Sequence, residues 1–200
     1  RRIAEESTRI KVGLDNVATN VMIADRDLNI IYMNKAITEM LGAAEADIRK
    51  DLPKFDAATL IGTNIDGFHK NPAHQTNMLA SLRGTHRTQI KVGSVSFGLV
   101  ANPILDAAGT RLGTVVEWRN RTLEVAVEQE VGNIVGAAAN GDFTQRVSLE
   151  GKDGFFKGLA ENINTLMETS NIGLNEVARV LGSLAKGDLT QQVEGDFKGT

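Results

Sequence analysis

Two histidines, five residues apart, flank the dipeptide Asn71-Pro72. Asparagine followed by proline is typical of a helix start, with asparagine as the cap and proline in the first turn. We therefore expect His69 in the turn before a helix that runs to about Leu82, where the backbone can aim a side chain inward, and His74 in the first turn of that helix. A neutral imidazole nitrogen is a common ligand for haem iron. The alternative is that each histidine is a surface or capping residue.

The only tryptophan, Trp118, falls in an apolar run that predicts a strand over residues 112–120. Alternate side chains of a strand share one face, so Val116 and Trp118 should point the same way. The indole N–H can donate a hydrogen bond and cannot accept one. Trp118 is therefore either a donor to a bound ligand or a core residue.

A pocket near these residues would be apolar. Met78 and Leu82 recur at helical spacing after His74, and such residues suit a pocket wall and an ordinary core equally well. His86 begins the next predicted strand beside Arg87, and we expect it to be solvated.

The elements that would position these residues are short strands and helices over residues 20–121. Strands are predicted at 20–25 and 28–34, followed by a short helix at 35–41 that Gly42 should end, and by short helical turns. After the helix at 71–82 come three further strand runs, at 85–92, 95–105 and 112–120. This order predicts an α+β domain, a five-stranded antiparallel sheet with helices on one face.

From Thr122 onward the pattern becomes helical. Apolar residues follow the three- and four-residue steps of a coiled-coil seam, with Ser170 and Gly173 interrupting it. The three seam groups are Val127, Val131, Ile134 and Ala138; Phe156, Leu159, Ile163 and Leu166; and Leu174, Val177, Leu181 and Leu184.

A repeat is the most specific internal signal. Residues 141–147 read GDFTQRV and residues 187–193 read GDLTQQV, 46 residues apart. The unit is a helix, a connector containing Gly-Asp, and a second helix, and such repeats indicate stacked supersecondary units. A helix with one apolar seam cannot bury it alone, so a parallel four-helix bundle in a dimer is the simplest solution. The alternative is a helical hairpin that packs on the first domain.

Composition excludes several classes of protein. The chain has 200 residues, a net charge of −3 and no cysteine. It therefore lacks disulfides, thiolate metal sites and the basic charge expected of a nucleic-acid-binding protein. No motif of an enzyme active site is present, so we expect no catalytic activity.

Two resemblances follow from these motifs. The helix, GDF or GDL connector and helix resemble the HAMP module, and their tandem spacing resembles the HAMP arrays of chemoreceptors. Strand, turn and strand followed by YMNKA resemble a PAS domain. Residues 64–75, NIDGFHKNPAHQ, resemble the PAS domain of methyl-accepting chemotaxis proteins of the aerotaxis type, which bind b-type haem.

The aerotaxis resemblance implies roles for particular residues. His69 matches the proximal ligand of the haem iron, and His74 is the alternative ligand or a partner near the propionates. Trp118 matches a residue that reaches the distal side, where an N–H suits bound O2. Leu99 matches a position that crowds the distal pocket. Met78 and Leu82 belong to the expected cofactor-binding set.

The domain organisation expected is a connecting helix at 1–19, a PAS sensor domain at 20–121, a first HAMP module at 122–170 and the start of a second at 171–200. The implied function is sensing of O2 or another diatomic gas, relayed through a HAMP homodimer to a chemotaxis histidine kinase and its adaptor. Alternatives are a ligand-free relay module and a PAS domain that binds FAD. We expect this part of the chain to be cytoplasmic and to belong to a longer protein. A membrane anchor elsewhere in that longer protein is compatible with this expectation.

Overall fold

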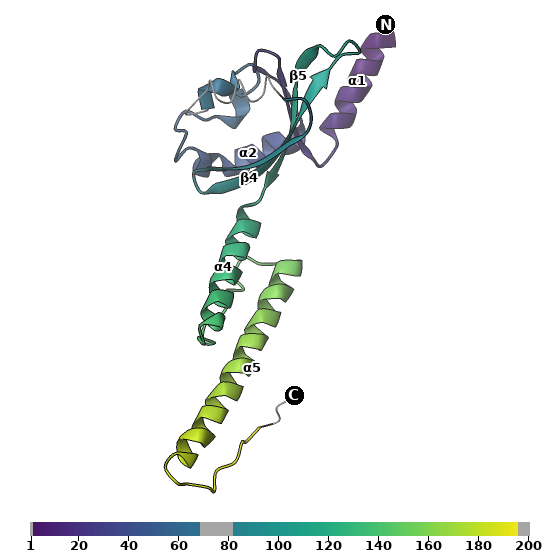
Figure 1. Ribbon diagram of the computed structural model, residues 1–200. Helices are drawn as coiled ribbons and strands as arrows, with labels where there is room; N and C mark the ends of the chain where they lie inside the picture. Colours follow the sequence, from purple (N-terminus) through teal and green to yellow (C-terminus); the bar gives the residue numbers. More distant parts are fainter. Residues whose placement is uncertain (1, 69–81, 196–200) are drawn as a thin grey trace. The chain divides into compact units, whose positions relative to one another are not determined.

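The computed structural model describes residues 2–68 and 82–195 (Figure 1). His69, His74 and Met78, three of the expected site residues, lie outside this range. The chain divides into a sheet unit, residues 1–123, and a helical unit, residues 124–200. Each unit is described by itself.

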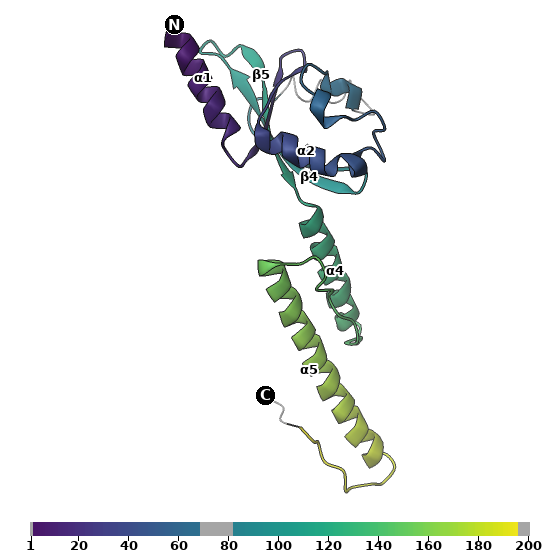
Figure 2. The same cartoon turned by 180° about the vertical axis from the view of Figure 1, so that it is seen from behind.

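The sheet unit is built on five strands in the spatial order β2-β1-β5-β4-β3, and each neighbouring pair is antiparallel. The strands are β1 (Asn20–Asp25), β2 (Ile30–Met33), β3 (His86–Val92), β4 (Val95–Leu105) and β5 (Arg111–Asn120). Helix α2 (Lys35–Ile48) lies across one face of the sheet (Figure 2). This arrangement confirms the predicted sheet with helices on one face.

Helix α2 corrects the expectation that Gly42 ends the helix after Leu41. The helix continues to Ile48 because its apolar stripe continues: Leu41, Ala44 and Ile48 are all buried in the core. Glycine inside a helix costs about 1 kcal/mol. Burial of one large aliphatic side chain is worth about 1.5–3 kcal/mol, so the stripe outweighs the glycine.

The β3–β4 hairpin is pinned against the end of α2. Gly93 has a φ of +59°, and a Cβ atom at this position would lie 1.9 Å from the carbonyl oxygen of Asp47. The Gly93 amide also donates to the carboxylate of Asp51 over 2.8 Å. Only glycine fits this close approach, and the hairpin and helix together close one end of the space between α2 and the sheet.

Helix α1 (Arg2–Asp15) precedes the sheet and buries no residue of its own. It projects from the sheet unit in both views (Figures 1 and 2). Its last turn is attached by hydrogen bonds from Tyr32 and Asn34.

The helical unit consists of α4 (Thr122–Ala139) and α5 (Gly154–Leu184), joined by an extended connector. Its buried cluster contains Ile134 of α4, Val147 of the connector, and Ala160 and Met167 of α5. Val131 and Ala138 pack against this cluster, as the predicted seam of α4 requires.

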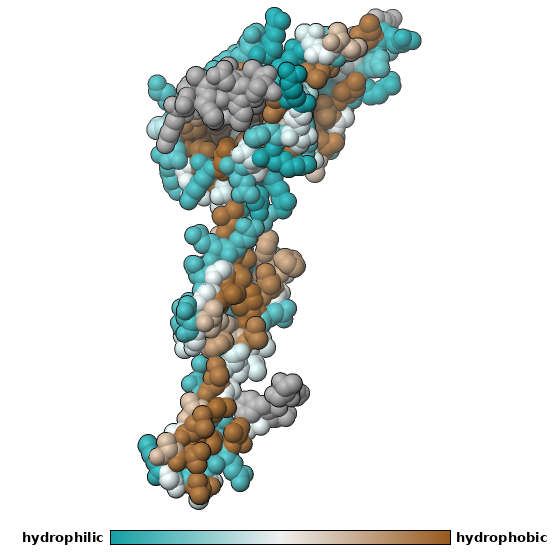
Figure 3. Space-filling model, in the orientation of Figure 1, coloured by the Kyte–Doolittle hydropathy of each residue, from teal (hydrophilic) through white to brown (hydrophobic). Residues whose placement is uncertain are grey.

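Within this single chain, Met167 of α5 is buried, whereas Leu166, a member of the seam predicted for a dimeric bundle, is 64% exposed. Helix α5 carries apolar residues on two adjacent faces, and α4 covers only the face of Ala160 and Met167. The rest forms an apolar stripe along the helical unit (Figure 3). Its most exposed members are Phe155, Leu166, Leu174, Val177, Leu181 and Leu184.

Candidate functional site

A cavity of about 600 Å³ lies between the inner face of the sheet and α2. Its walls are mostly aliphatic and aromatic, and its volume is in the range of sites that take small molecules or cofactors. Leu41 and Ile48 of α2 form one wall, and Phe55 and Phe68 close it from the segment that follows, with their rings in edge contact 6.0 Å apart.

Trp118 contributes an unsatisfied polar group to the lining of this cavity. Its Nε1 is buried and, among the described side chains, is the one buried donor or acceptor without a hydrogen-bond partner. Its ring packs edge-on against Phe97, with centroids 5.4 Å apart. A buried N–H without a partner costs about 1–3 kcal/mol, so an acceptor atom inside the cavity would recover that energy.

The β-register places Leu99 beside Trp118. Leu99 is paired with Trp118 on one side and with Thr88 on the other, and all three line the cavity. Leu82 is half-buried but is not one of the described residues that line it. Two of the expected pocket residues, Trp118 and Leu99, are therefore brought together.

His86 departs from the expectation that it is solvated. It is half-buried and lines the cavity, as the residue of β3 that pairs with Ala101. Strand alternation could have found it, because His86 shares its face with Thr88 and Ile90. Within residues 2–68 and 82–195, no cluster of three or more histidine, aspartate or glutamate side chains could hold a metal ion.

The end of β5 is tied to the start of β4. The Thr122 hydroxyl donates to the Asn120 side chain over 2.6 Å and accepts from the Ser96 amide over 3.1 Å. The Arg121 amide donates to the Ser96 carbonyl over 2.8 Å. Trp118 therefore lies two residues before a hydrogen-bonded junction at which α4 begins.

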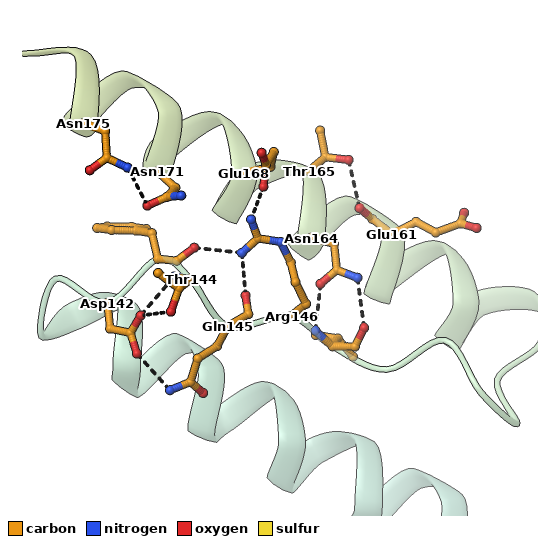
Figure 4. Close-up of polar contacts among 12 residues, drawn as sticks. Asp142, Thr144, Gln145, Arg146, Glu161, Asn164, Thr165, Glu168, Asn171 and Asn175 are labelled. Atoms are coloured by element: carbon orange, nitrogen blue, oxygen red, sulfur yellow. Dashed lines mark hydrogen bonds and ion pairs between the residues drawn. The ribbon is translucent and has the colours of Figure 1, made fainter.

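The first connector, residues 140–153, starts with a turn organised by Asp142 (Figure 4). The Asp142 carboxylate accepts hydrogen bonds from the amide and hydroxyl of Thr144 and from the Gln145 side chain. These bonds hold the pKa of Asp142 below its usual value, with the Thr144 hydroxyl as the largest cause. Gly141, with a φ of +87°, ends α4 in the left-handed conformation that favours glycine.

The connector is then clamped to both helices. Asn164 of α5 accepts from the Val147 amide over 2.7 Å and donates to its carbonyl over 2.9 Å (Figure 4). Glu130 of α4 pairs with Lys152 at 2.9 Å and accepts from the Ser148 amide. The Lys152 side chain is only 6% exposed, and the hydrogen bond from it is the largest cause of a lowered pKa at Glu130.

The second connector, residues 185–195, repeats this chemistry 46 residues later. Asp188 accepts from the amide and hydroxyl of Thr190, and Gly187 has a φ of +82°. Glu176 accepts from the Glu194 amide, as Glu130 does from Ser148, and pairs with Arg179 at 2.7 Å. The predicted repeat is thus present in the hydrogen bonds of the two connectors as well as in their amino-acid sequences.

Two family models match the chain. A PAS domain model matches residues 9–72, and a HAMP domain model matches residues 151–200. Among the described residues, no helix has both the length and the apolar character that a membrane span requires.

One curated relative is a methyl-accepting chemotaxis protein, McpB of Pseudomonas aeruginosa. It is 55% identical over 98% of this chain, and the chain spans 29% of its length. Among solved structures, the Aer2 receptor of Vibrio cholerae, described as a dual PAS-heme oxygen sensor, is 38% identical over 51% of this chain and 93% of that chain, with a TM-score of 0.48. The PAS domain of Bordetella pertussis BvgS is 14% identical over 66% and 98% of the two chains, with a TM-score of 0.45.

Proposed function

We propose that this chain is the gas-sensing segment of a chemoreceptor. The premise is that it carries PAS and HAMP domains and is similar over nearly its whole length to part of a methyl-accepting chemotaxis protein. In this proposal the cavity of the sheet unit binds b-type haem and responds to O2 or another diatomic gas. The helical unit passes the response on. The role is sensory and not catalytic.

One observation carries the proposal: a residue that lines a mostly apolar cavity has a buried N–H without a hydrogen-bond partner. A folded protein seldom leaves such a group unsatisfied. The indole of Trp118 is fixed by its contact with Phe97, so the donor is held in place before any ligand arrives. A donor in apolar surroundings favours a small ligand atom that carries partial negative charge.

The walls of the cavity, its volume and the histidine that the resemblance assigns to the iron all fit haem. The aliphatic and aromatic walls suit a flat macrocycle, and the cavity volume of about 600 Å³ suits a bound cofactor. Haem, when bound, supplies an iron atom that takes a diatomic gas. The sequence resemblance assigns the iron ligand to His69, with His74 as the alternative.

A response at Trp118 has a short route to the helical unit. The Trp118 indole lines the cavity, and the same strand ends at Asn120, which bonds Thr122 at the first turn of α4. A ligand shifts such a junction only if it binds the two positions of β5 with different affinity. A coupling free energy of about 1–3 kcal/mol is typical of such switches.

Two kinds of partner are proposed, a second copy of this chain and a kinase beyond it. The exposed apolar stripe of α5 is expected to be covered by the helices of a second copy in a parallel bundle. Beyond the chain, the proposed receiver is a chemotaxis histidine kinase with its adaptor.

The test is reconstitution of the purified chain with haemin, followed by absorption spectroscopy. A Soret band that is lost in His69→Ala and kept in His74→Ala supports His69 as the ligand, and the reverse result supports His74. A wild-type chain that stays colourless contradicts haem binding and leaves the ligand-free relay.

The role of Trp118 is tested by the rate of O2 dissociation from the haem-loaded chain. Trp118→Phe keeps an aromatic ring and removes the N–H. Loss of a hydrogen bond worth about 1.5 kcal/mol should accelerate dissociation about ten-fold. Leu112→Met is the matched control, because Leu112 lies on the same strand, is 53% exposed and does not line the cavity. Equal rates in the wild type and Trp118→Phe reject the donor role.

A further inference from the structure

Asn34 ties the last turn of α1 to the sheet unit. Its side chain is fully buried and uses its entire hydrogen-bonding capacity. Nδ2 donates to the carbonyls of Leu14 and Thr19 over 3.0 and 2.8 Å, and Oδ1 accepts from the amides of Val21 and Ile37 over 3.0 and 3.2 Å. One side chain therefore joins α1, β1 and α2.

Tyr32 makes a second attachment to α1. Its hydroxyl donates to Asp15 over 2.7 Å, and Asp15 also pairs with Lys11 at 2.8 Å. The Lys11 ammonium lies 5.6 Å from the centre of the Tyr32 ring. Because the hydroxyl bonds to Asp15 of α1, this contact reports whether the helix is docked.

The segment that leaves α1 then reaches Trp118. Asn20 is the first residue of β1 and is paired in register with Trp118. Its side-chain amide donates to the Trp118 carbonyl over 2.9 Å. The backbone that carries the buried indole N–H is thus held from the side of the incoming helix as well as from the junction with α4.

We propose that docking of α1 sets the position of the Trp118 donor, so that whatever lies upstream of α1 tunes the affinity of the cavity for its ligand. The proposal rests on the proposed function for the identity of the ligand, but not for the coupling itself. Since coupling between two sites is reciprocal, filling the cavity would also change how firmly α1 is held. The sheet unit would then receive a signal at one end and send one at the other.

The chain contains one tryptophan and one tyrosine, so each end of this path has its own optical probe. Quenching of Trp118 fluorescence by acrylamide reports access to the indole without any ligand. Burial and the bond to Asp15 raise the pKa of Tyr32 to about 12. Ultraviolet titration of the tyrosine therefore checks whether α1 is docked in solution, with Asp15→Asn expected to lower the midpoint.

The deciding variant is Tyr32→Phe, which removes only the hydroxyl that touches α1. Asn20→Ala removes the bond to the Trp118 carbonyl. Both are expected to raise the quenching constant of Trp118 about two-fold or more. Asn16→Ala is the matched control, because its amide donates to the Val12 carbonyl within the α1 region and reaches no strand.

The same variants are then loaded with haemin and their O2 release is measured. Tyr32→Phe and Asn20→Ala are expected to change the rate at least five-fold, the lower end of typical coupling, and Asn16→Ala to match the wild type. If the quenching constant and the O2 release rate of Tyr32→Phe equal those of the wild type, the proposal is overturned, whatever the result for Asn20→Ala. If the wild type takes up no haemin, the proposed function fails, while the quenching experiment still decides the coupling.

Discussion

Asp142 of the first connector and Asp188 of the second accept the same pair of hydrogen bonds, yet Val147 is 2% exposed and Val193 is 52% exposed. The turn forms in both places because its donors lie two residues from its acceptor. Burial differs because Asn164, on the helix that follows the first connector, bonds to both backbone groups of Val147. The second connector is held through the exposed side chain of Arg179, on the helix before it, which donates to Gln191 and to the Gln192 carbonyl. Local hydrogen bonds fix the path of a connector, and a second helix gives it stability.

The largest expected difference concerns the two glutamates that hold the connectors. Glu130→Gln leaves the nearly buried Lys152 without its carboxylate and should lower the free energy of unfolding of the helical unit by about 2–3 kcal/mol. Glu176→Gln should cost clearly less, since its partner Arg179 is 40% exposed and water screens the pair.

Urea unfolding followed by far-ultraviolet circular dichroism measures both changes. The fluorescence of Trp118 serves as the internal control, because it reports on the sheet unit and should not move. Equal losses in Glu130→Gln and Glu176→Gln would show that burial of Lys152 does not distinguish the two connectors.

Removal of methyl groups from the connector valines should give the next largest difference. Val147→Ala deletes two buried methyl groups and should cost about 2 kcal/mol. Val193→Ala changes an exposed side chain and should stay within about 0.5 kcal/mol of the wild type. The same unfolding experiment compares them, and a loss at Val193 as large as at Val147 would mean that the second connector is covered in solution.

The connector glycines should behave alike. Gly141 and Gly187 have φ values of +87° and +82°, so alanine at either position should cost about 1–2 kcal/mol of backbone strain. Amide hydrogen exchange measures the cost locally, because each glycine amide bonds to a carbonyl of the preceding helix turn. A loss of protection in one variant only would show that the two turns are not equivalent.

The smallest effect is a shift in titration at Glu176. The Arg179 side chain, and then the Glu194 amide, lower its pKa from 4.5 to about 2. A depressed carboxyl pKa stabilises the fold above the unfolded pKa, and this contribution is lost as the pH falls through the folded value. NMR titration should find the contact intact at pH 4, and Arg179→Gln should raise the pKa toward 4.5. An unshifted pKa in the wild type would remove the ion pair from the second connector.

Much of the fold could be predicted because local signals agreed with the tertiary packing. The bounds of β1 and β4 match the sequence expectation, and the seam of α4 is buried at Val127 and Ile134. The misplaced end of α2 has another origin, because Gly42 is overruled by the buried stripe on both sides of it. Sequence spacing also does not say which apolar face of α5 meets α4 within one chain, and that face proves to be the one with Met167.

The candidate site was predictable where residue chemistry is distinctive. A single tryptophan on an alternating strand pointed to Trp118, which lines the cavity together with Val116; its role toward a ligand stays a prediction. His69 and His74 remain predictions. Asn20 and Asn34 were not predicted as links, because amide hydrogen bonds to distant carbonyls depend on tertiary placement and leave no spacing pattern.

The two edges of the sheet bear on how copies of this chain can associate. The edge strand β2 has only four residues, and β3 turns Arg87, Gln89 and Lys91 toward solvent at the opposite edge. Short or charged edges resist the addition of a further strand. Self-association should therefore proceed through side chains of helices and spare the backbone of the sheet, so that neighbouring copies of this chain do not add strand to strand and grow into fibrils.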